Sequence, residues 1–101
     1  MRLYRVISES EFRDLHRCNR FRAISGTLTS KWFAESLDDC AEWGQWFTRV
    51  SGVPHVIFIE IELSADLANQ FITTPKRDNI GPARCATLEQ LKGVKWKKVE
   101  R

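Results

Sequence analysis

Residues 31–44, KWFAESLDDCAEWG, predict a short buried strand that runs directly into a capped helix. The aromatic run Trp32-Phe33-Ala34 suits a pleated strand. Ser36 is a favourable N-cap, and Asp38 and Asp39 suit the positive end of the helix dipole. Beyond the cap, apolar residues recur at the spacing of a helix with one buried face, namely Leu37, Cys40, Ala41, Gly44 and Phe47.

Two residues of this expected helix are unusual. A glycine in mid-helix costs about 1 kcal/mol relative to alanine, so Gly44 indicates close approach of a neighbouring backbone or of a ligand. Trp43 lies off the centre of the apolar face, so its indole can contact something other than the core. The alternative interpretation is a strand-turn-helix unit that serves packing alone.

Trp32-Phe33-Ala34 followed by Ala41-Glu42-Trp43 resembles the second signature of the ADP-ribosyltransferase superfamily. In poly(ADP-ribose) polymerases this signature is an aromatic residue, Phe-Ala, an acidic residue and a helix carrying Ala-x-Tyr, and the spacing agrees without a gap. The stretch from Ala41 to Gly44 is also similar to the Ala-x-Trp-Gly of rifamycin ADP-ribosyltransferases. Both expected tyrosines are tryptophans here, and tryptophan has an N–H donor but no hydroxyl.

The resemblance implies an NAD site. In the family the two aromatic residues, here Trp32 and Trp43, enclose the nicotinamide ring, and Phe33 is grouped with them as cofactor-binding. Offset stacking on a flat aromatic side chain favours a flat heteroaromatic ligand. Leu3-Tyr4-Arg5 is similar to the first signature, which implies that Arg5 is a catalytic and cofactor-binding residue. It would anchor the NAD ribose and phosphate and orient the cofactor, as a guanidinium fork does well. The alternative for Arg5 is an exposed strand arginine without a ligand.

The third signature of the family is a catalytic glutamate at the start of a late strand, and the matching position, Gly81 or Pro82, carries no carboxylate. Such a carboxylate stabilises the positive charge that develops as the bond between nicotinamide and ribose breaks. The rifamycin-modifying enzymes also lack this glutamate and use an aspartate just after the central apolar strand. The resemblance therefore implies Asp66 as the catalytic acid, with Glu60 and Glu89 as alternatives.

The rest of the chain predicts an α+β fold in a single domain over residues 1–101. We expect an ADP-ribosyltransferase-like arrangement of split antiparallel sheets with two main helices, from Ser8 or Ser10 to Cys18 and from Ser36 to Val50. Residues 73–81 are expected to form a polar loop, and residues 25–27 a turn. The expected strands cover residues 2–7, 32–34, 55–63, 80–87 and 94–99, with a short helix or turn capped by Ser64.

Composition excludes several classes of protein. With 43% hydrophobic and 29% charged residues, the 101-residue chain has the composition of a small globular domain. An odd count of three cysteines without metal-ligand spacing predicts free thiols in a reducing, cytoplasmic compartment and no metal site. No apolar run reaches membrane length. The net charge is +3, and the C-terminal basic run, Lys95, Lys97, Lys98 and Arg101, is interpreted as solvated, with a weak polyanion contact as the alternative.

These observations support three functional hypotheses. The first is an NAD-dependent ADP-ribosyltransferase or NAD glycohydrolase, whose short chain suits the toxin half of a toxin–immunity or toxin–antitoxin pair with an inhibitor protein as partner. The second is a catalytically inactive module of the same fold that binds NAD, ADP-ribose or a protein, as the missing glutamate suggests. The third is an RNA-binding protein with aromatic stacking platforms. The clustered acids and the lack of interleaved basic and aromatic residues argue against the third hypothesis.

Overall fold

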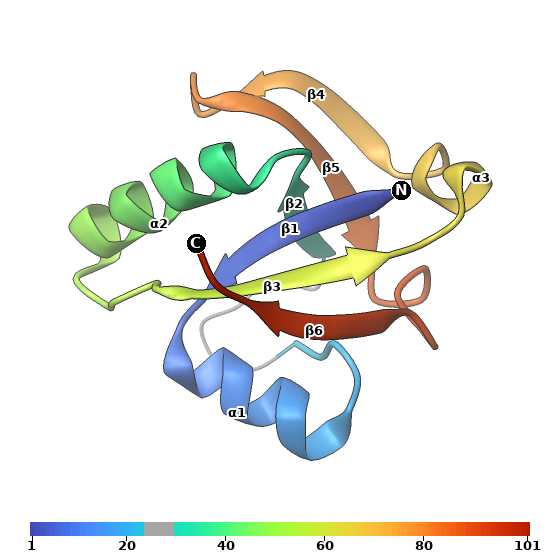
Figure 1. Ribbon diagram of the computed structural model, residues 1–101, viewed down its shortest axis with the longest axis horizontal. Helices are drawn as coiled ribbons and strands as arrows, with labels where there is room; N and C mark the ends of the chain where they lie inside the picture. Colours follow the sequence, from blue (N-terminus) through green and yellow to red (C-terminus); the bar gives the residue numbers. More distant parts are fainter. Residues whose placement is uncertain (24–29) are drawn as a thin grey trace.

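The computed structural model describes residues 1–23 and 30–101. Its elements are β1 (Arg2–Ile7), α1 (Glu9–Cys18), β2 (Ser30–Ala34), α2 (Leu37–Ser51), β3 (Ile57–Glu62), α3 (Ala65–Ala68), β4 (Ile72–Arg77), β5 (Gly81–Thr87) and β6 (Lys95–Val99). The strands form an antiparallel sheet in the order β4-β5-β2-β1-β3-β6 (Figure 1). The predicted α+β class is therefore confirmed. The turn expected at residues 25–27 lies outside the described residues.

The strands form a single hydrogen-bonded sheet, so the expectation of two packed sheets was wrong. β1 and β3 pair along the whole of both strands, from Arg2 with Glu62 to Ile7 with Ile57. Among the described residues, β1 and β2 share one paired position, Tyr4 with Ala34. Figure 1 shows β2 passing behind β1 at a steep angle. The sheet is therefore joined at its centre by a single pair and separates beyond Tyr4.

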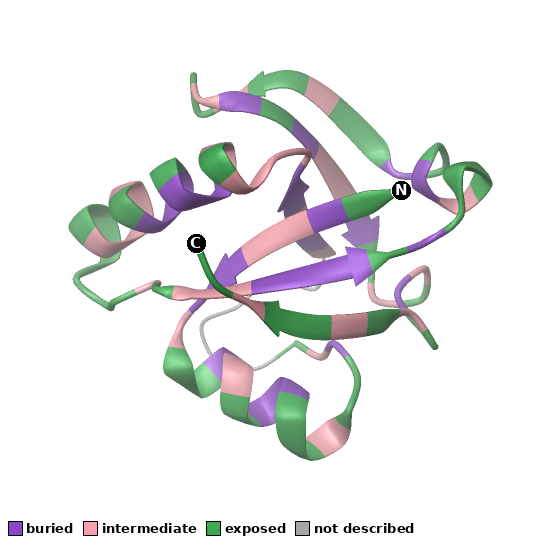
Figure 2. Cartoon of the chain, in the orientation of Figure 1, coloured by how far each residue is buried: buried purple, intermediate pink, exposed green. Residues whose placement is uncertain are grey.

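Alternation along β1 divides the apolar side chains between the two faces of the sheet. Leu3 and Ile7 are fully buried and share a core with Phe33, on the face that α1 covers. Val6 packs with Trp43 on the other face, which α2 covers. Because one helix covers each face, the centre of the sheet is enclosed from both sides (Figure 2).

The two main helices begin and end where their caps predict. The hydroxyl of Ser8 caps α1, and that of Ser36 accepts a hydrogen bond from the third residue of α2 at 3.2 Å. Gly52 ends α2 with a φ of 74°, the left-handed conformation that favours glycine. A Cβ on Gly44 would lie 2.8 Å from the carbonyl oxygen of His55. The glycine in mid-helix therefore allows the close backbone approach that its position predicted.

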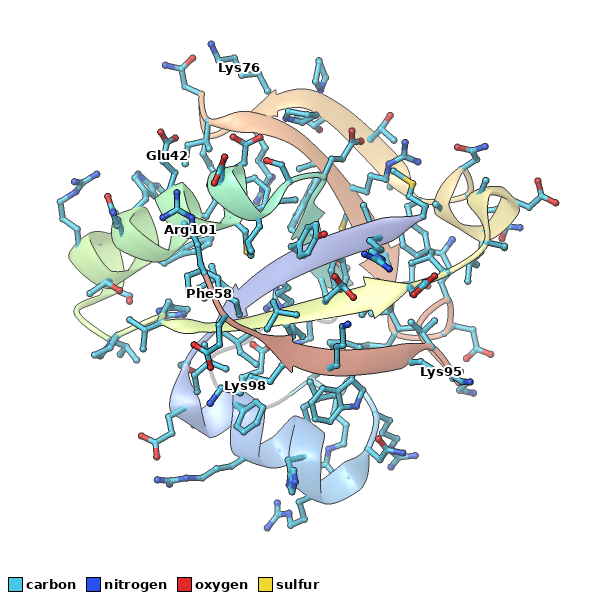
Figure 3. All side chains as sticks on the ribbon, viewed as in Figure 1. Glu42, Phe58, Lys76, Lys95, Lys98 and Arg101 are labelled. Atoms are coloured by element: carbon cyan, nitrogen blue, oxygen red, sulfur yellow. The ribbon has the colours of Figure 1, made fainter. Side chains whose placement is uncertain are left out.

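Residues 73–81 do not form the expected polar loop, because they contain most of β4 and its turn into β5. Pro75 lies within β4, which is an edge strand of the sheet, so its missing N–H can face away from the neighbouring strand. The opposite edge is β6, where Lys95 and Lys98 are both exposed, and Lys98 places its Nζ 5.6 Å from the centre of the Phe12 ring (Figure 3). Exposed lysines on an edge strand discourage pairing with another chain. The other two residues of the C-terminal basic run form ion pairs, Lys97 with Glu60 at 3.4 Å and Arg101 with Asp38 at 3.1 Å.

Candidate functional site

A cleft of about 420 Å³ opens where β1 and β2 separate. Its walls come from the second half of β1, the start of α1, β2, α2, the segment before β3 and the end of β4. The described residues that line it are Arg5, Val6, Ser8, Ser10, Glu11, Ser30, Trp32, Trp43, Phe47, Ser51, Val53, His55 and Arg77. Aromatic rings, guanidinium groups, a carboxylate and an imidazole thus meet in one concave site, which is the usual character of a small-molecule site.

Arg5, Trp32 and Trp43, which the sequence analysis expected to converge, all line this cleft. They reach it from different faces of the sheet. Trp32 and Trp43 pack in the core beneath α2, whereas Arg5 lies on the same face of β1 as Leu3 and Ile7 and bonds to Glu11 of α1. The three residues meet only because the sheet separates between β1 and β2. Their roles toward a cofactor remain predictions.

The Arg5 guanidinium is held entirely by protein groups. Its Nε and Nη2 donate to the two carboxylate oxygens of Glu11 at 2.8 and 3.0 Å, a bidentate pair. Its Nη1 donates to the backbone carbonyl oxygen of Trp32 at 3.1 Å. Arg5 therefore links β1, α1 and β2 at the place where the backbone ladder between the strands is interrupted.

Glu11 lies between two basic groups beneath the cleft. The Lys31 side chain is 1% exposed, and its Nζ lies 3.9 Å from a Glu11 oxygen. This Nζ has no hydrogen-bond partner among the described residues. Burial raises the pKa of Glu11, but Arg5 and Lys31 together bring this pKa below its ordinary value of 4.5. Burial lowers the pKa of Lys31, and nearby Glu11 opposes this only in part. Glu11 is therefore an ionised carboxylate whose charge is already balanced by its neighbours.

The guanidinium of Arg77 stacks on the indole ring of Trp32. The central carbon of Arg77 lies 3.8 Å from the centre of the indole, which is a close cation–π contact. Arg77 comes from the last position of β4, far from Trp32 in sequence but next to it across the cleft. The resemblance implied nicotinamide against Trp32, yet in this structure one face of that ring is covered by Arg77.

Trp43 forms a wall of the cleft but is only 2% exposed. Its Nε1 is buried and has no hydrogen-bond partner within residues 1–23 and 30–101. Phe47, one helical turn further along α2, is half-buried and also lines the cleft. Phe47 therefore offers more accessible aromatic surface than Trp43 does.

His55 lines the cleft beside Phe47, with their ring centres 5.5 Å apart. Its Nδ1 is 2.7 Å from the carbonyl oxygen of Val53. A carbonyl can only accept, so this contact assigns the proton to Nδ1 and leaves Nε2 as an acceptor in the neutral ring. The imidazole is therefore oriented, with one nitrogen suited to taking a proton.

Other residues that the sequence analysis proposed lie outside the lining of the cleft. Phe33 is fully buried and packs edge-on against Phe21 in the core. Asp66 is in the first turn of α3, beyond the end of β3 opposite to His55 (Figure 1). Of the alternative acids, Glu60 is buried and pairs with Lys97 at 3.4 Å, and Glu89 is an exposed residue.

Glu11, His55 and Arg77 line the cleft, although no local sequence pattern indicated them as site residues. Ser8 and Glu11 have the spacing of a capping box, which predicts that the glutamate folds back onto the helix terminus. In the structure its carboxylate instead bonds to Arg5. His55 precedes the clearest strand of the chain, and Arg77 stands in a segment that was expected to be a loop. No local sequence pattern indicated which side chains His55 and Arg77 contact.

No family model, curated protein or solved structure matches this chain. Within the described residues, none of the helices combines the length and apolar character needed to cross a membrane. In the same part of the chain, the His, Cys, Asp and Glu side chains form no group of three or more that would hold a metal ion.

Proposed function

We propose that this chain binds NAD in the cleft between β1 and β2, as a small domain of the ADP-ribosyltransferase type. The observation that carries the proposal is the meeting of Trp32, Phe47 and two arginines, Arg5 and Arg77, in one concave site at the division of the sheet. An aromatic wall suits the nicotinamide ring, and guanidinium groups suit the diphosphate. The resemblance of residues 32–44 to the second signature supports the same ligand.

The state of the cleft carboxylate favours binding of NAD over its cleavage. Glu11 is the carboxylate among the described lining residues, and both of its oxygens are bonded to Arg5. A carboxylate neutralised in this way stabilises a developing cation less than a free one does. The binding of NAD or ADP-ribose is therefore the primary proposal, and transfer of ADP-ribose is the second.

Binding is tested by calorimetry and by thermal unfolding with NAD. A ligand that binds only the folded state, present at about 100 times its dissociation constant, adds about 2.7 kcal/mol of stability. Trp32→Leu should weaken NAD binding at least about tenfold, because it removes the ring that supports Arg77. Trp96→Leu is the matched control, since Trp96 is a half-buried tryptophan on β6 outside the cleft lining. Absence of binding by the wild-type chain at millimolar NAD would refute the proposal.

Trp43→Ala would be a poor test of binding. Trp43 is almost fully buried, and the removal of a large buried ring typically costs about 3–5 kcal/mol of folding free energy. A loss of NAD binding in that variant would therefore not separate a lost contact from a lost fold.

The second candidate function is cleavage of NAD, with ADP-ribose passed to water or to an acceptor. The oriented His55 favours it. As the acceptor oxygen forms a bond to the ribose carbon, its proton passes to Nε2 of His55. The bond from ribose to nicotinamide breaks, and its electron pair stays on the nicotinamide nitrogen. A positioned general base contributes about 10²–10⁴-fold to such a step.

Nicotinamide release from NAD, followed by chromatography, separates the two candidates. We expect His55→Gln to slow release about 100-fold, with NAD affinity nearly unchanged. His16→Gln is the control, because this second histidine lies on α1 outside the cleft lining. Asp66→Asn should leave release unchanged, because α3 is remote from His55. A wild-type chain that binds NAD and releases no nicotinamide would be an inactive module.

A further inference from the structure

We propose that Arg77, supported on the ring of Trp32, is the phosphate-binding residue of the cleft. This inference rests on the proposed function, because it assigns the diphosphate of NAD to a particular side chain. The resemblance to known enzymes points to Arg5 for the ribose and phosphate. The geometry points instead to Arg77.

Three of the five N–H groups of Arg5 already donate to protein acceptors, and its charge is paired with that of Glu11. Its Nε, Nη1 and Nη2 each donate to a protein acceptor at 2.8–3.1 Å, two of them to the Glu11 carboxylate. A phosphate at Arg5 would have to compete with a carboxylate that is bonded in bidentate fashion and mostly buried. Arg5 is therefore a positioning residue that fixes the relative placement of β1, β2 and α1.

Arg77 is held in a different way. Its guanidinium carbon is 3.8 Å from the centre of the Trp32 ring, and the side chain is 33% exposed. The nearest carboxylate oxygen, from Asp78, is 3.7 Å from Nε, which is too long for a hydrogen bond. Among the described residues, Arg77 donates no side-chain hydrogen bond. Stacking holds a guanidinium while its N–H groups stay available, and their fork matches two phosphate oxygens.

The turn after β4 fixes where Arg77 lies. The amide of Ile80 donates to the carbonyl oxygen of Arg77 at 3.0 Å, which closes a four-residue turn. Its two central residues, Asp78 and Asn79, have φ angles of 54° and 61°. Positive φ at both positions is the mark of the type I′ turn, which matches the twist of a two-stranded hairpin. Arg77 is thus presented to the cleft by a tight hairpin, and little ordering of the chain is needed on binding.

This placement predicts how the ligand is recognised. One face of Trp32 serves as the platform for Arg77, so the nicotinamide ring is left to the wall formed by α2 and Phe47. A ligand without phosphate loses the contact with Arg77 but keeps the aromatic wall. The cleft should therefore prefer NAD over nicotinamide riboside, and this preference should depend on Arg77.

The experiment measures the affinities of NAD and of nicotinamide riboside by calorimetry for the wild-type chain and three variants. Charge-assisted hydrogen bonds contribute about 1.5–3 kcal/mol, so Arg77→Gln should weaken NAD binding about 10–100-fold. Its effect on nicotinamide riboside should stay below about twofold. Arg77→Lys keeps the charge but loses the fork and the stacking, so NAD affinity should still fall about tenfold.

Lys76→Gln is the matched control. Lys76 is the neighbouring residue on β4, carries the same charge and extends into solvent away from the sheet (Figure 3). NAD affinity should change by less than about twofold in this variant. An equal loss in Lys76→Gln and Arg77→Gln would reduce the effect to general electrostatic attraction and overturn the inference.

Two further outcomes would also overturn the assignment. If Arg77→Gln weakens NAD and nicotinamide riboside equally, Arg77 is part of the general wall and not a phosphate ligand. If Arg77→Gln leaves NAD affinity unchanged, the phosphate lies elsewhere while NAD binding itself stands. A wild-type chain that binds neither ligand refutes the proposed function, and the inference falls with it.

Discussion

Replacement of Glu11 by glutamine should destabilise the fold strongly, because Glu11 pairs with the largely buried Arg5 and lies beside the buried Lys31. The side chains of Arg5, Glu11 and Lys31 are 18%, 10% and 1% exposed. Glu11 makes the bidentate pair with Arg5 and lies 3.9 Å from Lys31. Glu11→Gln keeps the shape of the side chain but removes its charge, so the largely buried Arg5 and the buried Lys31 both lose the carboxylate that pairs with them.

Removal of one partner of a buried ion pair typically costs about 3–5 kcal/mol. For a domain of this size, each kcal/mol lowers the melting temperature by about 4–8 °C, so the melting temperature should fall by at least about 12 °C. Lys31→Met should not lower the stability of the fold. It removes a buried ammonium whose lowered pKa indicates that the folded state disfavours its charge, and it leaves the pair between Arg5 and Glu11 intact.

The assay is urea unfolding at pH 7 of the wild type, both single variants and the double variant. We expect Lys31→Met alone to be neutral or stabilising, and in the Glu11→Gln background to restore at least about 1 kcal/mol. Glu9→Gln is the control, since Glu9 pairs with Arg13 on the exposed face of α1, where such pairs contribute about 0.3–0.5 kcal/mol. A loss below about 1 kcal/mol in Glu11→Gln, or no rescue in the double variant, would refute the reasoning.

The same carboxylate predicts sensitivity to acid. The pKa of Glu11 is lowered in the folded chain, so its contribution to stability is complete above the ordinary glutamate value. This contribution is lost as the pH falls through the lowered pKa. Between about pH 5 and 3, the wild type should lose more free energy of unfolding than Glu11→Gln does, and the two curves should converge.

Two further predictions concern buried positions. Gly44→Ala should destabilise the fold by more than about 1 kcal/mol in urea unfolding, because the new Cβ would lie 2.8 Å from the backbone carbonyl oxygen of His55. This loss should appear although alanine favours helices over glycine. A stabilised variant would contradict the close approach. Iodoacetamide at pH 8 should modify Cys18 and Cys85 well before Cys40, because Cys40 is fully buried and burial raises its pKa to about 12. Equal rates by peptide mass spectrometry would contradict this prediction.

The parts of the fold that depend on neighbouring residues could be predicted from the sequence. Ser36 begins α2 because its hydroxyl accepts from an amide three residues later, and that interaction needs no tertiary context. Gly52 ends the helix for an equally local reason. β4 was missed because Pro75 and the polar residues around it are typical of a loop. They are tolerated in a strand only at the edge of a sheet, and the sequence does not show which strand is at the edge.

The candidate site was less predictable, because its geometry depends on contacts between distant elements. Trp32 and Trp43 were found by their resemblance to a known signature, and the structure places both on the cleft. The partner of Arg5 lies on the next helix, and the cation on Trp32 comes from a hairpin more than forty residues later. Lys31 offered no sign of its burial, since lysines are almost always exposed.

The order of the strands has a consequence for how fast the chain folds. The hairpin of β4 and β5 closes over a short turn and can form early. The other ladders bring together residues that are far apart in the chain, such as Ser30 with Thr87 and Phe58 with Val99. Each of these closures loses chain entropy before its contacts repay it. We therefore expect this chain to fold more slowly than a helical bundle of the same length.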